Sequence, residues 1–106
     1  MLKITNPITG DELQVANQDF SDRMTWEEAK RACNELGSGW RLPNKQELKE
    51  IYEQLYEKGQ GNFKEAAYWS STESANDDAW YFLFTNGPAY STTKRSTIYV
   101  RAVRAF

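Results

Sequence analysis

Apolar and polar residues alternate with the period of an α-helix in two stretches of the N-terminal half of the chain. The apolar positions of the first stretch repeat every three or four residues: Trp26, Ala29, Cys33 and Leu36. Thr25 and Glu28 have the spacing of a capping box, and Gly37 is a natural helix stop. The pattern therefore predicts a first helix that begins after Thr25 and ends before Gly37.

The second helical stretch has its own apolar stripe and its own cap. The stripe is formed by Leu48, Ile51, Tyr52 and Leu55. Asn44 followed by Glu47 predicts a second capping box, and Gly59 marks the end, so we expect a helix over about Lys45 to Lys58.

The segment that joins the two helices carries an apolar plug. Pro43 fixes its own φ and pushes Leu42 into an extended conformation. Trp40 and Leu42 then alternate onto one face and are expected to be buried, while Arg41 points the other way.

The period changes from 3.6 to 2 in the C-terminal half, which predicts strands. The expected strands, with one more near the N-terminus, are Glu12 to Asn17, Tyr68 to Thr72, Trp80 to Phe84, Ala89 to Thr92 and Thr97 to Arg104. Strand 80–84 is apolar on both faces, as in a central strand covered on each side. The last two strands are expected to form a hairpin around residues 93–96, and Asn86-Gly87 predicts a tight turn. Two helices followed by an antiparallel sheet indicate an α+β domain.

Composition narrows the possible functions. The 106 residues form one domain, 1–106, and 13 basic against 15 acidic side chains give a net charge of −2. Such a balance argues against nucleic-acid binding. No basic and apolar leader follows Met1 and no stretch is long enough to span a bilayer, so we expect no membrane insertion. The location stays open: cytoplasmic, or secreted or on the cell surface if the domain is cut from a longer protein.

The chain contains no histidine and a single cysteine. The absence of histidine removes the commonest general base and transition-metal ligand, and one cysteine excludes an internal disulfide. We therefore predict no catalytic residues, no metal site and no cofactor. Cys33 is expected to be a buried thiol on the apolar face of its helix.

Four motifs, in order and spacing, resemble one bacterial family. They are Thr25-Trp26-Glu27-Glu28-Ala29, Trp40-Arg41-Leu42-Pro43-Asn44 with Glu47-Leu48, Tyr68-Trp69-Ser70-Ser71-Thr72-Glu73, and Tyr99-Val100-Arg101-Ala102-Val103-Arg104. Over roughly Thr9 to Phe106 the chain resembles the domain of unknown function DUF1566, also found as the C-terminal domain of a Legionella collagen-like adhesin. The resemblance implies a C-type-lectin-like fold: two helices packed on a small twisted antiparallel sheet with long loops. Members with a known role bind rather than catalyse.

The chain departs from this family at one position. Many members have a cysteine in the first helix and another in the last motif, which the resemblance links in a disulfide; here Cys33 is present and the second position is Ala102. The resemblance also implies that Arg41 and Arg101 are structural, tying loops or carboxylates beneath the sheet.

The loops spanning 72–80 and 86–95 are the predicted ligand-binding face, because recognition is commonly carried by polar and aromatic loops on a rigid scaffold. The candidate residues are Asn76, Asp77, Asp78, Asn86, Tyr90, Thr92, Lys94 and Arg95. Lys94 and Arg95, at a hairpin tip, are expected to be solvated turn charge, with contact to an acidic partner as the alternative. The tyrosines 81, 90 and 99 form either a binding set or part of an aromatic core.

Two chemical alternatives at these loops are less favoured. Asp77 and Asp78, with Glu73 nearby, could supply oxygen ligands to calcium, but a solvated acidic loop fits better because the lectin calcium motifs are missing. The hydroxyl cluster 70–72 has no base beside it, so its expected role is to bond backbone at a strand end.

The sequence thus predicts a non-enzymatic recognition module that binds a protein or a neutral glycan through its long-loop face. The alternative is an intracellular or phage-derived interaction or inhibitor domain. An enzyme related to the formylglycine-generating group is the third reading, disfavoured because that chemistry needs a reactive cysteine pair.

Overall fold

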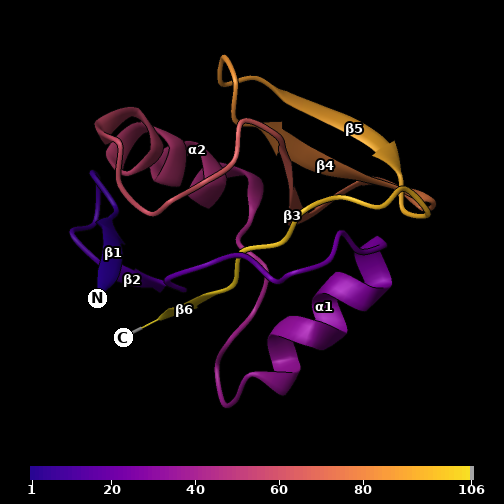
Figure 1. The fold of residues 1–106 in the computed structure, drawn as a ribbon, viewed down its shortest axis with the longest axis horizontal. Helices are drawn as coiled ribbons and strands as arrows, with labels where there is room; N and C mark the ends of the chain where they lie inside the picture. The colour runs from indigo at the N-terminus through magenta and orange to yellow at the C-terminus, as the bar shows by residue number, and fades with distance from the viewer. Residues whose placement is uncertain (106) are drawn as a thin grey trace.

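The computed structural model describes residues 1–105 and contains two three-stranded antiparallel sheets and two helices (Figure 1). The first sheet has the order β1-β2-β6, with β1 over Leu2–Thr5, β2 over Glu12–Val15 and β6 over Val103–Ala105. The second has the order β3-β4-β5, with β3 over Ala67–Ala75, β4 over Asp78–Leu83 and β5 over Ala89–Thr93. The first sheet therefore joins the two ends of the chain. No helix within residues 1–105 is both long and apolar enough to cross a membrane.

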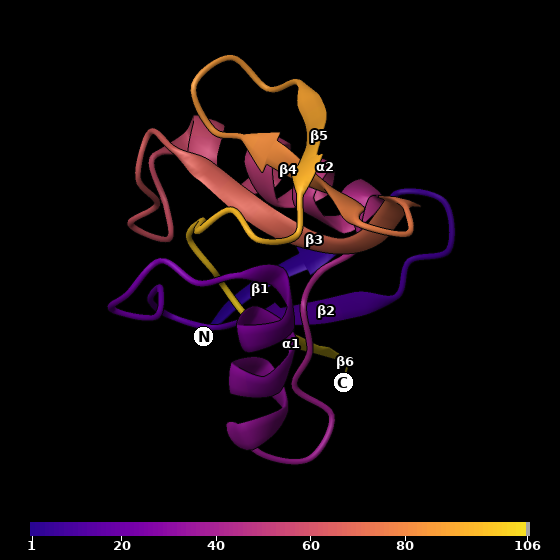
Figure 2. The ribbon, with the colours of Figure 1, turned by 90° about the vertical axis from the view of Figure 1, so that its right-hand side faces the viewer.

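Both helices begin at the predicted caps. α1 covers Trp26–Glu35 and α2 covers Lys45–Gln54, and each has a complete capping box. The second helix is shorter than expected, because a separate 3₁₀ turn, η1, covers Tyr56–Lys58 before Gly59 ends it at φ +72°. α2 contacts β1 of the first sheet and β3 and β4 of the second, so it connects the two sheets (Figure 2).

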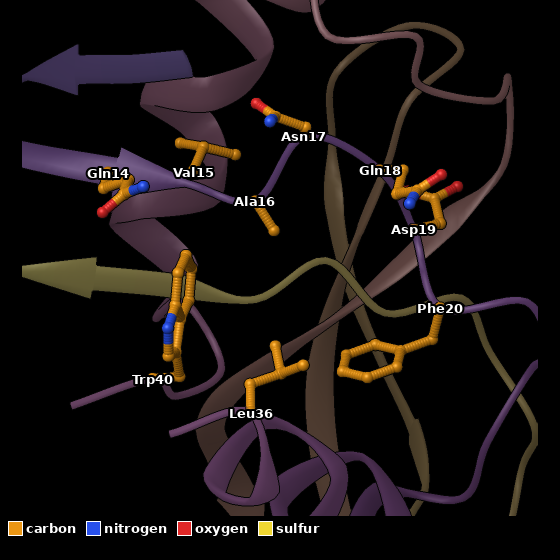
Figure 3. Close-up of a pocket in the computed structure, with 9 residues that line it drawn as sticks. All are labelled: Gln14, Val15, Ala16, Asn17, Gln18, Asp19, Phe20, Leu36 and Trp40. Carbon is orange, nitrogen blue, oxygen red and sulfur yellow. The ribbon is translucent and has the colours of Figure 1, made fainter. Parts of the chain in front are cut away.

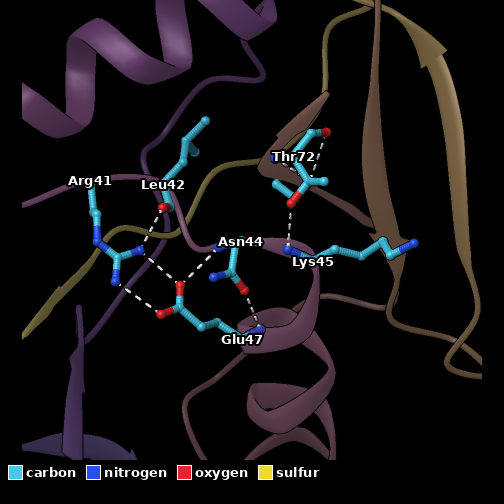
Figure 4. A network of polar contacts seen from close by, with 7 residues as sticks. Arg41, Leu42, Asn44, Lys45, Glu47 and Thr72 are labelled. Atoms are coloured by element: carbon cyan, nitrogen blue, oxygen red, sulfur yellow. Dashed lines mark hydrogen bonds and ion pairs between the residues drawn. The ribbon is translucent and has the colours of Figure 1, made fainter. Parts of the chain in front are cut away.

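The prediction of an apolar plug at the joint between the helices is confirmed in part. Leu42 is buried as predicted, but Trp40, also predicted to be buried, is only half-buried. Arg41 pairs through its backbone with Val103. The Arg41 guanidinium donates to both carboxylate oxygens of Glu47, at 2.8 and 2.9 Å (Figure 4). Burial raises the pKa of Glu47, but the hydrogen bonds from Arg41 and from the Asn44 backbone outweigh it, so the pKa lies below its usual value. The Glu47 carboxylate therefore both completes the capping box of α2 and holds Arg41 of the joint in place.

Two hydrophobic cores lie on either side of the segment 98–103. The first packs around α2 and includes Leu48, Ile51, Tyr68 and Phe84; the second packs around α1 and includes Trp26, Cys33, Leu42 and Trp69. Ile98, Val100 and Ala102 enter the second core, whereas Tyr99 and Val103 face the first. The side chains of this segment thus alternate as expected of a strand, and β4 is the central strand expected from its two apolar faces.

The predicted hairpin between 89–92 and 97–104 is wrong. β5 pairs with β4 instead, while Ile98 bridges Met24 and Tyr99 bridges Tyr68. The backbone groups of this segment bond to other partners: Ile98 exchanges hydrogen bonds with Met24, and the carbonyls of Val100 and Ala102 accept from the N–H groups of Phe20 and Ala16. The strand β1 was not predicted, since the turn signals around Asn6 dominate that part of the sequence.

A buried ion cluster ties the loop after β2 to the last segment. Arg101, fully buried, donates from Nε to Asp19 Oδ1 at 2.8 Å and from Nη1 to the Ala16 carbonyl at 2.9 Å. Asp19 Oδ2 accepts from the Tyr68 hydroxyl at 2.7 Å and from Lys64 Nζ at 3.2 Å. Burial and the neighbouring Asp19 carboxylate raise the pKa of Tyr68. The structural role predicted for Arg101 is confirmed, and Asp19 is its partner.

Candidate recognition surface

The first predicted loop, 72–80, is mostly strand. β3 continues to Ala75 and β4 begins at Asp78, which leaves Asn76 and Asp77 as a two-residue turn. The register shifts between Glu73 and Ala75, so the end of this hairpin is irregular. Asn76 and Asp77 are exposed, whereas Asp78 is half-buried.

A second turn lies beside the first. Thr93 at the end of β5 pairs with Asp78, and the Lys94 backbone N–H donates to the Asp77 carbonyl at 2.8 Å. The two turns therefore form one end of the β3–β4–β5 sheet. We call it the open end and define it by Asn76, Asp77, Asp78, Thr92, Lys94 and Arg95.

Lys94 fixes the open end and is not the solvated turn charge that we expected. Its Nζ donates to Glu73 Oε2 at 2.6 Å and to the Asn76 carbonyl at 2.8 Å, and it lies 4.3 Å from the centre of the Trp26 ring. Only 16% of its side chain is exposed. The hydrogen bond from Lys94 lowers the pKa of Glu73. Arg95, the next residue, is exposed as predicted.

Asn86 does not belong to this group. The turn that contains it connects β4 to β5 at the opposite end of the sheet, since Asp78 and Thr93 mark one end and Leu83 and Ala89 the other. Gly87 adopts φ +89°, and a Cβ there would lie 2.9 Å from Cε2 of Tyr52 in α2. That end packs against a helix, so the expectation that both loops share one face is wrong for Asn86.

The three tyrosines divide between the two roles that the sequence left open. Tyr99 packs against the first core and Tyr81 against the second. Tyr90 is 46% exposed on the edge strand β5, opposite Tyr81, with ring centres 5.9 Å apart. Of the three, Tyr90 alone presents a large exposed ring, on β5 three residues before Thr93 at the open end.

The hydroxyl and thiol groups near this face serve the fold. Ser70 Oγ donates to the Trp80 carbonyl at 2.7 Å. Thr72 Oγ1 accepts a hydrogen bond from the Lys45 backbone N–H at 3.0 Å (Figure 4). Cys33 is fully buried, and burial raises the pKa of its thiol to about 12. Ala102 lies in the same core as Cys33, which fits the disulfide position that the family resemblance implies.

The geometry does not favour the calcium alternative. The Glu73 carboxylate is engaged by Lys94, and residues 1–105 contain no group of three or more acidic, cysteine or histidine side chains arranged to hold a metal ion. Asp77 and Asp78 therefore remain as two carboxylates at a turn, with the third nearby carboxylate, Glu73, paired with Lys94.

A groove that sequence reasoning missed is lined by residues from β2, the following loop, the end of α1 and the joint (Figure 3). Residues 17–23 are polar except for Phe20, which predicts only a loop, and the pattern at Trp40 predicts only part of the plug. The remaining signal is the set of three amide side chains Gln14, Asn17 and Gln18, which lie across the end of an expected strand and the start of an expected loop.

This architecture is that of the C-type-lectin-like fold. The structure of botrocetin matches with a TM-score of 0.63 and 12% sequence identity, covering 95% of each chain. A chain in the complex of botrocetin with a mutant von Willebrand factor A1 domain matches with the same values. At this identity the likeness shows the fold alone.

The chain belongs to the Lcl C-terminal domain family, whose sequence profile matches residues 9–104. This is the family that the four motifs resemble. No protein of curated function matches the chain at a significant level.

Proposed function

We propose that this domain is a non-enzymatic recognition module that binds a partner protein through the open end and Tyr90. The observation that carries the proposal is that some residues at this end fix the two turns while others are exposed and available for contact. Lys94 and the backbone bond from Lys94 to Asp77 hold the two turns together. The side chains of Asn76, Asp77 and Arg95 are exposed on that frame. A contact surface that is already rigid loses less conformational entropy on binding.

The chemistry of the exposed residues suits a protein surface. Asp77 and Arg95 carry opposite charges on neighbouring turns, and Tyr90 offers a large ring with a polar tip. Tyrosine and arginine are enriched among the residues that dominate protein interfaces. A strongly anionic polysaccharide fits less well, because Lys94 is engaged with Glu73 and Asp77 lies beside Arg95. The fold itself supports the proposal, since the botrocetin neighbour is bound to a von Willebrand factor domain in its structure.

The chemistry of the remaining groups supports a role without catalysis. The chain has no histidine, its one thiol is buried with a raised pKa, and the Ser70 hydroxyl is held by a backbone carbonyl. A nucleophile needs a base or a lowered pKa to react. A formylglycine-generating type of activity, which needs a reactive cysteine pair, has no support in these residues.

The test compares two triple variants with equal numbers of substitutions. Asp77→Ala, Tyr90→Ala and Arg95→Ala remove the proposed contacts, whereas Ile8→Ala, Lys49→Ala and Glu53→Ala change exposed residues elsewhere. Immobilised wild-type domain is used to isolate a partner, which is then purified and titrated calorimetrically against all three proteins. We expect the first variant to bind at least about tenfold more weakly, because hot spots at the centre of an interface cost 2 kcal/mol or more.

Equal affinity of the first variant and wild type, with unchanged melting temperatures, would place the binding surface elsewhere. The same comparison applies if the domain acts inside a cell as an inhibitor, because that partner is also a protein.

A further inference from the structure

The groove in Figure 3 lies far from the open end along α1. Leu36, which caps the C-terminus of α1, lines the groove, whereas Trp26 at the N-terminus donates its backbone N–H to the Lys94 carbonyl. The 10-residue helix between them spans about 15 Å. Any ligand in the groove therefore leaves the open end accessible.

The groove has aromatic walls and an apolar floor. Trp40 and Phe20 stand on opposite sides, with Leu36 and Ala16 between them (Figure 3). Its volume is about 480 Å³, within the range of small-molecule sites. Leu36 is 48% exposed, so the apolar floor is open to solvent. An exposed apolar concavity of this kind is a candidate for ligand binding.

Amide side chains line the rim of the groove. Arg104 donates from Nη2 to Gln14 Oε1 at 2.9 Å, and its guanidinium lies 5.0 Å from the centre of the Trp40 ring. The Gln14 amide nitrogen has no hydrogen-bond partner among residues 1–105 and keeps its donors for a ligand. Asn17 and Gln18 are exposed and add two more amides, each able to donate and accept.

The wall that carries these amides is fixed in place. The Ala16 N–H donates to the Ala102 carbonyl at 2.9 Å and the Phe20 N–H to the Val100 carbonyl at 3.1 Å. Arg101 holds the Ala16 carbonyl as well as Asp19, whose carboxylate is turned into the buried ion cluster. The one acidic residue of the lining is therefore neutralised, and the groove offers rings and neutral amides.

We infer that this groove binds a neutral sugar ring of the hexose type. A pyranose combines an apolar face of C–H groups, which suits Trp40 and Phe20, with hydroxyls that both donate and accept, which suit Gln14, Asn17 and Gln18. An anionic sugar is disfavoured because the lining of the groove contains no cationic side chain and one carboxylate, Asp19; Arg104 contacts the lining only through Gln14 and Trp40. A purely apolar ligand would leave the Gln14 donors unpaired, at a cost in free energy. This site is independent of the protein partner proposed for the open end.

The test uses the ¹⁵N-labelled domain titrated with glucose, galactose, mannose and their β-linked disaccharides. We expect at least one to cause saturable shifts of the Trp40 indole N–H and of the side-chain amides of Gln14, Asn17 and Gln18. Glucuronate, the charged counterpart of glucose, and benzyl alcohol, an apolar ring without the sugar hydroxyls, should shift these signals less at equal concentration.

Variants separate binding from folding. Asn17→Ala with Gln18→Ala changes exposed residues, so the melting temperature should stay unchanged while sugar affinity falls about tenfold. Trp40→Phe keeps a ring in the second core and should also weaken binding. The matched control, Asp77→Ala with Arg95→Ala at the open end, should bind sugar as wild type does. Absence of saturable groove shifts with every neutral sugar, shifts confined to another surface, or stronger binding of benzyl alcohol than of any sugar would each overturn the inference.

Discussion

Arg101 and Lys94 each connect segments that are distant in the sequence, but their surroundings differ. The Arg101 side chain has no exposed surface and its carboxylate partner Asp19 is 5% exposed. Lys94 lies at the surface with a partner, Glu73, that is 56% exposed. The first cluster holds the two cores together, and the second holds two turns in a fixed relation while their side chains remain free. The buried Arg101 cluster therefore stabilises the fold, whereas the exposed side chains around Lys94 are available to contact a partner.

The largest effect is expected at the buried cluster. Arg101→Met should lower the free energy of unfolding by about 3–5 kcal/mol, because losing one partner of a buried pair leaves the other charge uncompensated. Chemical denaturation measures this change. The control is Arg41→Met, whose pair with Glu47 is 43% and 22% exposed and should cost about 1 kcal/mol or less. Similar losses in the two variants would show that burial does not separate these arginines.

A smaller effect is expected at Lys94. Lys94→Met keeps an unbranched side chain but removes the hydrogen bond to the Asn76 carbonyl and the charge over the Trp26 ring, so the free energy of unfolding should fall by about 1–2 kcal/mol. Arg95→Met is the adjacent control and should change the free energy of unfolding by less than about 0.5 kcal/mol. If both variants unfold at the same denaturant concentration as wild type, Lys94 does not fix the open end.

The smallest effect concerns the titration of Glu73. Its hydrogen bond from Lys94 lowers the pKa below the unfolded value of about 4.3, so the contact is intact above that pH and is lost as the pH falls through the folded pKa. Carbon-detected NMR should follow the Glu73 carboxyl at acidic pH in wild type and in Lys94→Met. We expect a higher midpoint in the variant. Identical midpoints would mean that Lys94 and Glu73 are not paired in solution.

Local signals in the sequence were enough to predict the two helices. Thr25 and Asn44 each have a glutamate three residues later, and both caps are formed by atoms close together along the chain. The apolar face of each strand was also predictable, because alternation depends on neighbouring residues alone. Which strand pairs with which was not, because alternation specifies a face and not a partner, as the wrong hairpin for residues 97–104 shows.

The candidate site was only partly predictable, because local patterns identify turns but do not say which turns lie together. Asn76, Asp77 and Arg95 were found from the composition of turns, and the structure brings them to one end of a sheet. Asn86 was misplaced, because its turn lies at the other end of β4. The pair of Asp19 with Arg101 joins positions 82 residues apart, so no local pattern contains it. The groove depends on that pair and on the fold around it.

Site-specific photo-crosslinking tests the proposed recognition surface most directly. A benzoylphenylalanine is placed at position 90 in one protein and at position 8, which is also exposed, in another. Each protein is irradiated with the isolated partner, with and without an excess of unmodified wild-type domain. The proposal predicts a single adduct from position 90 that the excess abolishes, and none from position 8. An adduct from position 8, or no competed adduct from position 90, would contradict recognition through the open end and Tyr90.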